Sequence, residues 1–246
     1  MDEIQSLARG LTLLCLMADV NHEVSVTALA DQLGVHKGTV SRTLHTLMNH
    51  AFVEKAPDGR RFQLGPALVR LSRSVIKRSK LREVAKPYLK QLVELTGECA
   101  HLAIYAQGQA LYMDQVESDA SLRVNADVGH MAPLHCTALG KILLAFGKYP
   151  LPEILEKRTQ RTCSSIEQLQ SEITEIRKNG FAVDNEEYDS GVRCIAVPVF
   201  DYKGALAGAI GISGPAARLK PEKVSETARQ VCRIGELLSE RLKFSK

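Results

Sequence analysis

Residues 27–52 read TALADQLGVHKGTVSRTLHTLMNHAF and carry the pattern of two short helices joined by a tight turn. Thr27 is of a residue type that caps helix N-termini, and Gly34 permits the left-handed conformation that ends a helix. Beyond the turn, apolar residues recur every three or four positions from Val40 to Leu47 and form a narrow stripe on a second helix. This stretch is therefore predicted to form a helix-turn-helix.

The polar faces of the second helix carry side chains suited to DNA. Arg42 can bond guanine O6 and N7 together, while Thr39 and Ser41 can reach phosphates or bases. The predicted DNA contacts from this helix are Lys37, Thr39, Ser41, Arg42 and His45.

A helix is predicted before this pair, over residues 4–20. One apolar face of that helix is expected to pack into a core, and it consists of Ile4, Leu7, Leu11, Leu14 and Ala18.

A basic hairpin is predicted after the pair. Residues 52–55 and 61–64 read as short alternating strands around Ala-Pro-Asp-Gly-Arg, a turn-forming sequence, which places Arg60 and Arg61 at or near its tip. Three helices followed by such a hairpin form a winged helix-turn-helix, and both arginines join the predicted DNA contacts. The alternative is a three-helix structural domain.

Beyond residue 90 the pattern changes to mixed strands and helices. The predicted strands are 99–107, 110–118, 121–129, 193–200 and 205–213, the first three forming an antiparallel meander. The predicted helices are 137–146, 165–179 and 222–242. This order predicts an α+β fold in which helices cover a mostly antiparallel sheet.

The composition is that of a globular protein, with 45% hydrophobic and 24% charged residues in 246. Three parts are predicted: a DNA-binding domain over 1–65, a basic linker helix over 66–80, and an effector-binding and oligomerisation domain over 81–246. No apolar run is long enough for a membrane span, and the acidic N-terminus does not resemble a secretion signal. A cytoplasmic, nucleoid-associated protein is expected, and its six scattered cysteines favour reduced thiols.

The positive charge is concentrated in residues 66–90, which contain eight Lys and Arg against one Glu. Such a segment can attract a polyanion, although a solvated helix face explains it equally well. It could hold phosphates or present Leu68, Leu71 and Val75 to a partner chain.

Two groups of motifs resemble the IclR family of bacterial transcriptional regulators. LADQLGVHKGTVSRTL (29–44) and the hairpin ending in FQLG (62–65) resemble its DNA-binding domain. GHMAPLHCTALGKILLAF (129–146), DNEEYDSGVRCIAVPVFD (184–201) and GAIGISGP (208–215) resemble its profilin-like, GAF-related ligand domain. The resemblance implies an N-terminal winged helix-turn-helix domain and a C-terminal effector domain.

The resemblance also implies a function. It indicates a transcriptional regulator, in most family members a repressor, that binds double-stranded operator DNA as a homodimer or dimer of dimers. A small carboxylic acid would control operator binding, without an enzymatic activity, a cofactor or a membrane partner. One departure is Gly38, where the family usually has a serine, so Gly38 is not among the predicted contacts.

The effector site is predicted partly from physics and partly from the resemblance. Free backbone N–H groups at the start of the helix that His135 opens suit a carboxylate. The family's site pattern extends the prediction to His135, Ala138, Leu139, Asp184, Cys194 and Ser213. Gly211 stands where family members that bind very small keto acids have a serine, which favours a larger sugar acid or aromatic acid.

Two other functions would use the same residues. Cys194 or Cys136 with His135 and Asp184 could form the catalytic set of a Cys-dependent enzyme. Cys194 and Asp184 with His130 or His135 could bind zinc in a metal-dependent sensor. No nucleophile motif or paired ligand spacing accompanies them, so no catalytic or metal residue is assigned. The other acidic residues of this stretch are expected to face solvent: Glu186, Glu187 and Asp189.

Overall fold

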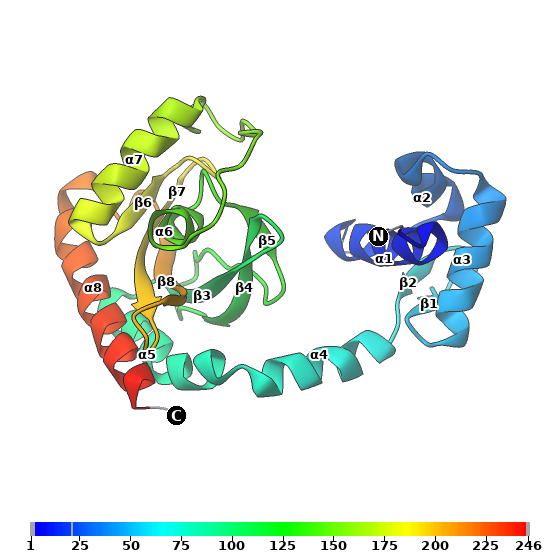
Figure 1. The fold of residues 1–246 in the computed structure, drawn as a ribbon, viewed down its shortest axis with the longest axis horizontal. Helices are drawn as coiled ribbons and strands as arrows, with labels where there is room; N and C mark the ends of the chain where they lie inside the picture. Colours follow the sequence, from blue (N-terminus) through cyan, green and yellow to red (C-terminus); the bar gives the residue numbers. More distant parts are fainter. Residues whose placement is uncertain (1–2, 21, 245–246) are drawn as a thin grey trace. The chain divides into compact units, whose positions relative to one another are not determined.

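The computed structural model describes residues 3–20 and 22–244, and the chain divides into two compact units, Met1–Arg78 and Ser79–Lys246 (Figure 1). No helix within the described residues combines the length and the apolar character needed to cross a membrane.

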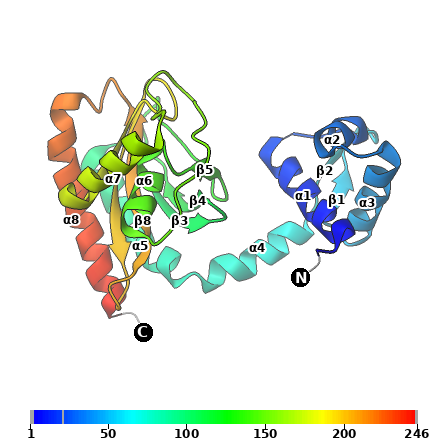
Figure 2. The ribbon, with the colours of Figure 1, turned by 45° about the horizontal axis from the view of Figure 1, so that its top comes forward.

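The first unit contains three helices, a two-stranded antiparallel hairpin and a fourth helix (Figure 2). Its elements are α1 (Gln5–Val20), α2 (Val26–Leu33), α3 (Lys37–Asn49), β1 (Val53–Lys55), β2 (Phe62–Leu64) and α4 (Ala67–Arg78). One fully buried leucine from each of the first three helices belongs to a shared core: Leu13, Leu29 and Leu44. This core confirms the predicted winged helix-turn-helix.

The core-facing side of α1 differs from the predicted one. Gly10, Leu13 and Met17 are buried, whereas Leu7 and Leu11 are 59% and 56% exposed. The helix carries two apolar stripes, and only one of them can face α2 and α3. The prediction therefore chose mainly the stripe that this single chain leaves uncovered, which also includes Ile4, while Leu14 of the predicted face does pack against the core.

The start of α2 also differs from the prediction. Ser25, not Thr27, is the N-cap, and its Oγ accepts a hydrogen bond from the Ala28 N–H at 3.2 Å. Thr27 already lies inside the helix. Gly34 ends the helix in the left-handed conformation, with φ of 63°, as predicted.

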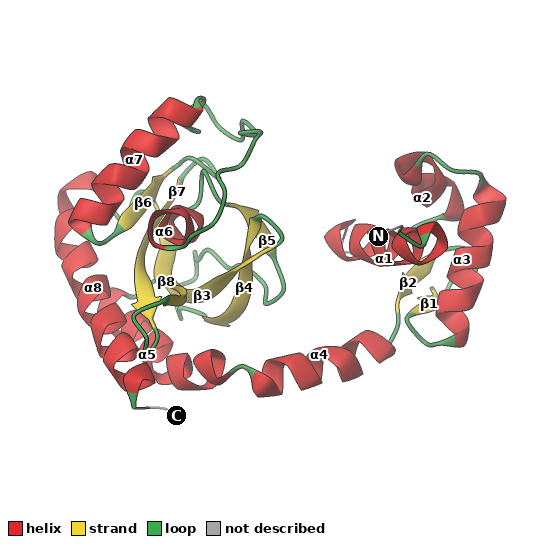
Figure 3. Cartoon of the chain, in the orientation of Figure 1, coloured by secondary structure: helices red, strands yellow, loops and turns green. Residues whose placement is uncertain are grey.

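The second unit is built on a six-stranded antiparallel sheet with strand order β5-β4-β3-β8-β7-β6 (Figure 3). The strands are β3 (Cys99–Ala106), β4 (Gln109–Val116), β5 (Met131–Pro133), β6 (Ala182–Asn185), β7 (Val192–Phe200) and β8 (Leu206–Pro215). The helices are α5 (Lys80–Thr96), α6 (Ala138–Phe146), α7 (Ile166–Asn179) and α8 (Pro221–Lys243). The predicted α+β architecture is confirmed.

The two faces of this sheet pack differently. Large residues of the central strands, such as Leu102 and Ile210, pack against α5 and α8. On the other face, Ala103, Ala196 and Ala209 share a core with α6 and α7. Small side chains on that face leave room between the sheet and the start of α6.

The strand prediction fails at two places. Residues 121–129 form no strand; the edge position beside β4 is taken instead by β5, whose Met131 pairs with Leu111. The sequence analysis also missed β6, which pairs with β7. At 121–129 the local alternation was misleading, and in both places strand pairing depends on which segment reaches the sheet edge.

Candidate functional site

The exposed face of α3 carries most of the predicted DNA contacts. Lys37, Ser41, Arg42 and His45 are exposed, and the last three lie within a little more than one helical turn. Thr39 is half-buried instead, and together with Arg42 it lines a groove between α1 and α3. The structure therefore brings together three side chains that could read base edges, with Thr39 at the margin.

At the hairpin tip, Arg61 is bound by carboxylates and Arg60 is not. The Asp58 carboxylate accepts the Arg61 Nε–H at 2.6 Å and the backbone N–H groups of Arg60 and Arg61 at 2.9 Å. These bonds, led by the Arg61 backbone N–H, lower the pKa of Asp58 to about 2. A second carboxylate, that of Glu23, lies 2.9 Å from Arg61 Nη1. Among the described residues, the Arg60 side chain has no ion-pair partner.

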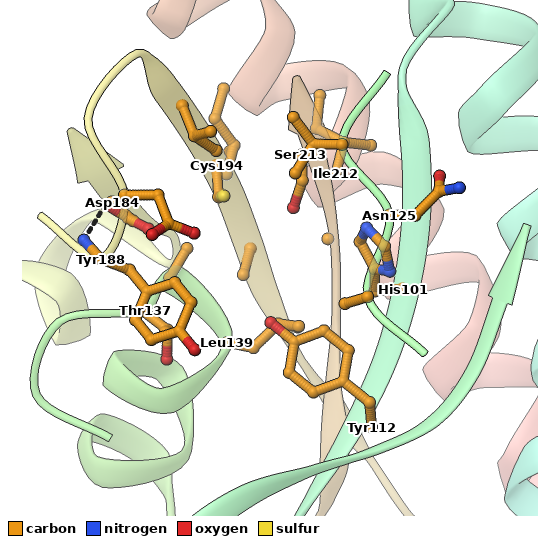
Figure 4. Close-up of a pocket in the computed structure, with 18 of the residues that line it drawn as sticks. His101, Tyr112, Asn125, Thr137, Leu139, Asp184, Tyr188, Cys194, Ile212 and Ser213 are labelled. Carbon is orange, nitrogen blue, oxygen red and sulfur yellow. Dashed lines mark hydrogen bonds between the residues drawn. The ribbon is translucent and has the colours of Figure 1, made fainter. Parts of the chain in front are cut away.

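A cavity of about 260 Å³ lies in the second unit between the sheet, the start of α6 and residues 124–127 (Figure 4). Five of the six predicted effector residues line it: Ala138, Leu139, Asp184, Cys194 and Ser213. His135 does not line it, because its ring lies beside the Glu156 carbonyl, with Nε2 3.0 Å from that oxygen. No Lys or Arg belongs to the lining.

Strand register explains why residues so far apart meet in the cavity. Asp184 on β6 pairs with Cys194 on β7, and Cys194 pairs with Ser213 on β8. Ser213 pairs in turn with Cys99 on β3. Paired residues of an antiparallel sheet point to the same face, so these four side chains form one row across the sheet.

The start of α6 supplies hydrogen-bond donors to the same cavity. Thr137 is the N-cap, and its Oγ1 accepts the Gly140 N–H at 3.1 Å. Helix geometry leaves the N–H groups of Ala138 and Leu139 without intrahelical partners, and both residues line the cavity. Together with the helix dipole, these groups favour an anion.

Several polar lining residues were missed by the sequence analysis, above all His101 and Tyr112. His101 is 1% exposed, and neither of its ring nitrogens has a hydrogen-bond partner within the described part of the chain. Burial lowers the pKa of His101 to about 4, so the ring is neutral at physiological pH. The available signal was its position in β3, two residues after Cys99 and hence on the same face.

Asp184 belongs to a buried network that links the β6–β7 turn to α6. Its Oδ1 accepts the backbone N–H of Glu187 at 2.8 Å, and burial is the main cause that raises its pKa to about 7. Glu187 itself is buried and lies 2.7 Å from Lys141 Nζ of α6. The prediction that Glu187 faces solvent is therefore wrong: a buried lysine on α6 requires a nearby carboxylate.

The other two acidic residues of the turn are less buried. Asp189 is exposed at the rim of the cavity. Glu186 is half-buried and lies 3.4 Å from Arg161 and 3.5 Å from Arg193.

The thiols of the site are held in the protonated state. Burial, followed by the Asp184 charge, raises the pKa of Cys194 well above its usual value, and burial raises that of Cys136 to about 12. A nucleophilic cysteine needs the opposite shift. With His135 outside the cavity, the hypothetical Cys-His-Asp set is not assembled around Cys194. Within the described residues, no three His, Cys, Asp or Glu side chains are grouped to hold a metal ion.

Comparison with known proteins matches both units to one family. Residues 6–57 match the IclR helix-turn-helix domain, and residues 73–240 match the IclR C-terminal domain of bacterial transcriptional regulators. The HTH-type transcriptional regulator XynR of Escherichia coli is 30% identical over 98% of both chains. The transcriptional repressor IclR of Escherichia coli is 30% identical over 95% of this chain and 88% of its own.

Solved structures agree with this match. An IclR-type regulator from Silicibacter has a TM-score of 0.83 and 26% identity, covering 97% of this chain and 96% of its own. An IclR homologue from Microbacterium hydrocarbonoxydans, solved in complex with 4-hydroxybenzoate, has a TM-score of 0.76 and 20% identity, covering 96% and 99%.

Proposed function

Because the chain belongs to the IclR family of DNA-binding bacterial transcriptional regulators, which are not enzymes, we propose that it is a repressor whose operator binding is controlled by a small organic acid. The residues before 66 would bind DNA, residues 66–80 would link the domains, and residues 81–246 would bind the acid. The single observation that supports the acid is the pair of free N–H groups at the start of α6, on residues that line a cavity.

The proposed DNA contacts are of two chemical kinds, contacts with bases and contacts with phosphates. Arg42, with Ser41 and His45, would read bases in the major groove from the exposed face of α3. Arg60 would hold a phosphate, because its side chain is not engaged by an acidic residue of the described chain. Arg61 would brace the wing through Asp58 and Glu23 rather than contact DNA directly. Lys37 and Thr39 would contribute at the edges of the interface.

A second copy of the chain is part of the proposal. One winged domain buries too little surface for operator specificity, so a homodimer or dimer of dimers is expected. The uncovered stripe of α1 supports this expectation, since Ile4, Leu7 and Leu11 are all more than half exposed. Leu71 and Val75 of α4, at 49% and 65% exposed, offer a further apolar surface for a partner chain.

The cavity limits the kind of acid. At about 260 Å³ it lies near the lower end of ligand pockets, which suits a metabolite of one ring or a short chain. Its side chains provide no cation, so a single carboxylate at the start of α6 is favoured over a dicarboxylate. Ala196 presents only a methyl group to the cavity, and Gly211 has no side chain because a Cβ there would clash with the Ile195 carbonyl oxygen. The complex of the Microbacterium homologue with 4-hydroxybenzoate supports the aromatic class.

An operator-release assay tests the proposal. The natural operator, taken from the DNA beside the regulator's own gene, is labelled and bound, and organic acids are added while fluorescence anisotropy is followed. A matching acid should change the anisotropy and raise the melting temperature, because it binds only the folded state. Mass spectrometry should find it chemically unchanged. A panel of sugar acids and aromatic acids that affects neither quantity would refute control by these acids.

A further inference from the structure

We infer that His101 is a specificity-determining residue that binds a hydroxyl group of the effector, on the part of the molecule remote from its carboxylate. The effector class would then be hydroxy acids rather than simple carboxylic acids. This inference rests on the proposed function, since it assumes that the carboxylate lies at the start of α6.

The first support is the isolation of a polar ring inside the protein. His101 is 1% exposed and lines the cavity, yet neither ring nitrogen has a hydrogen-bond partner among the described residues. A buried polar group without a partner is costly, and such groups are rare in folded proteins. A ligand that supplies the missing partner regains this cost, whereas one that lacks it does not.

The second support is the place of the ring. In Figure 4, Thr137, Asp184 and Tyr188 lie on one side of the cavity, while His101, Tyr112 and Asn125 lie on the other. Thr137 caps α6, so the side opposite His101 is also the side with the free N–H groups. A ligand with its carboxylate at α6 therefore extends its other end toward His101.

The third support is the set of residues that surround the ring. In the sheet His101 pairs with Gly211, and Gly211 pairs with Ala196 on the next strand. His101 also pairs with Gln115 on β4, but the Gln115 Oε1 accepts the Ala126 N–H at 3.3 Å, and neither ring nitrogen of His101 is bonded among the described residues. Tyr112 meets the ring edge-to-face, with centroids 5.6 Å apart, which positions the imidazole but leaves its nitrogens unpaired.

The charge state of His101 decides which ligand group fits. A neutral imidazole has one N–H donor and one acceptor nitrogen, and either tautomer can face the cavity. A hydroxyl both donates and accepts, so it pairs with either tautomer. A second carboxylate only accepts, and no lining cation would compensate its charge. A hydroxyl therefore fits better than a second acidic group.

Matched acids and two variants test the inference by titration calorimetry. The probes are benzoate with para-hydroxybenzoate, and hexanoate with its terminally hydroxylated counterpart. For the wild-type protein, at least one hydroxy acid should bind roughly tenfold or more tightly than its unhydroxylated counterpart. His101→Phe keeps the ring shape and should lose most of this preference. His101→Gln keeps a donor and an acceptor and should retain part of it.

Thermal unfolding without any acid provides an independent readout. If His101 is kept for a ligand, His101→Phe should raise the melting temperature, because it removes an unpaired buried polar group. A lower melting temperature would show that the imidazole has a structural role, and the inference would be wrong.

The outcomes separate this inference from the proposed function. Equal affinities for hydroxylated and unhydroxylated acids, with both lost in Ala138→Asp, would overturn the role of His101 and support the acid site. A hydroxyl preference that persists in His101→Phe would also overturn it. Failure of all four acids to bind the wild-type protein would count against the proposed site and against the inference built on it.

Discussion

Lys141 of α6 and Glu187 of the β6–β7 turn form a buried ion pair, with Nζ 2.7 Å from Oε1 and 2.9 Å from Oε2. The pair connects α6, which contributes Ala138 to the cavity lining, with the β6–β7 turn, which follows Asp184. Glu187 also accepts the Asn185 N–H at 3.1 Å, so its orientation is set from both sides. Movement of α6 should therefore be transmitted to the turn.

The first prediction follows from this burial. Lys141→Met leaves the Glu187 carboxylate uncompensated and should lower the free energy of unfolding by about 3 to 5 kcal/mol. The double variant with Glu187→Gln should regain most of the loss, because the carboxylate that still lacks its lysine, that of Glu172, is about one-third exposed to solvent. Chemical denaturation measures both. The matched control is Lys178→Met, which breaks the exposed pair with Glu175 and should change stability by less than about 1 kcal/mol.

The second prediction concerns pH and two groups of the cavity. His101 has a pKa of about 4 in the folded protein, below the ordinary 6.5, so the unfolded state binds more protons between these values. Its contribution to stability therefore rises with pH in that window. Asp184 has a folded pKa of about 7, above the ordinary 3.8, so the folded state binds more protons there and its contribution falls as pH rises. The two effects oppose each other.

A variant that removes one of the two groups should reveal how that group changes the free energy of unfolding with pH. Between about pH 5 and 6, His101→Phe should become less stable as pH rises, by roughly 1 kcal/mol per unit, relative to the wild-type protein. Asp184→Asn should show the opposite relative slope. Unfolding in denaturant at several pH values measures them. Parallel pH profiles for the wild-type protein and both variants would contradict the assigned shifts.

The third prediction concerns base readout. Arg42→Ala should weaken operator binding by about 1 to 3 kcal/mol and relax the base preference, as expected when a bidentate contact with guanine is lost. Anisotropy titrations on operator and random DNA measure this. An equal loss on both DNAs would show that Arg42 contacts only phosphate.

The fourth prediction compares the two wing arginines. Arg60→Ala should lower affinity for all DNA sequences and make the salt dependence shallower by roughly one unit, the sign of a lost phosphate contact. Arg61→Ala should change the salt slope less, because Arg61 is paired with Asp58 and Glu23. Identical slopes for the two variants would mean that Arg61 leaves its carboxylates when DNA binds.

Much of this fold could be predicted from local periodicity. The apolar stripe of α3, with Val40 and Leu44 buried, repeats at a spacing that the sequence shows directly. The pairing of Asp184 with Cys194 was not predicted, because β6 was missed. Residues 121–129 alternate as a strand does, but whether they join the sheet depends on competition with β5 for its edge.

The features that were not predicted depend on contacts between residues far apart in the sequence, or on the absence of a contact. Glu187 is buried because Lys141, far along the chain, needs a counter-charge in the core. His101 is recognisable only once the cavity is known, because its significance lies in the partners it lacks. The stripe that contains Leu7 and Leu11 is apolar, but it stays exposed in a single chain.

The last prediction tests the anion site at the start of α6. Deleting a side chain cannot remove a backbone N–H, so the test must introduce a charge. Ala138→Asp places a negative charge where the helix dipole stabilises it and where an incoming acid is repelled. The helix should form normally, while the response to the acid is lost. Ser213→Ala should weaken acid binding by about 1 to 3 kcal/mol, because a buried polar partner is removed.

The operator-release assay decides between the start of α6 and another binding site. Circular dichroism and operator binding without acid should match the wild-type protein, since Ala138 lies in the unit that begins at Ser79, outside the DNA-binding unit. Against that baseline, an Ala138→Asp protein that still releases the operator at the wild-type acid concentration would place the effector elsewhere. Loss of release with folding intact would instead tie the acid to the N–H groups of Ala138 and Leu139, because the added charge acts only over a short range in salt.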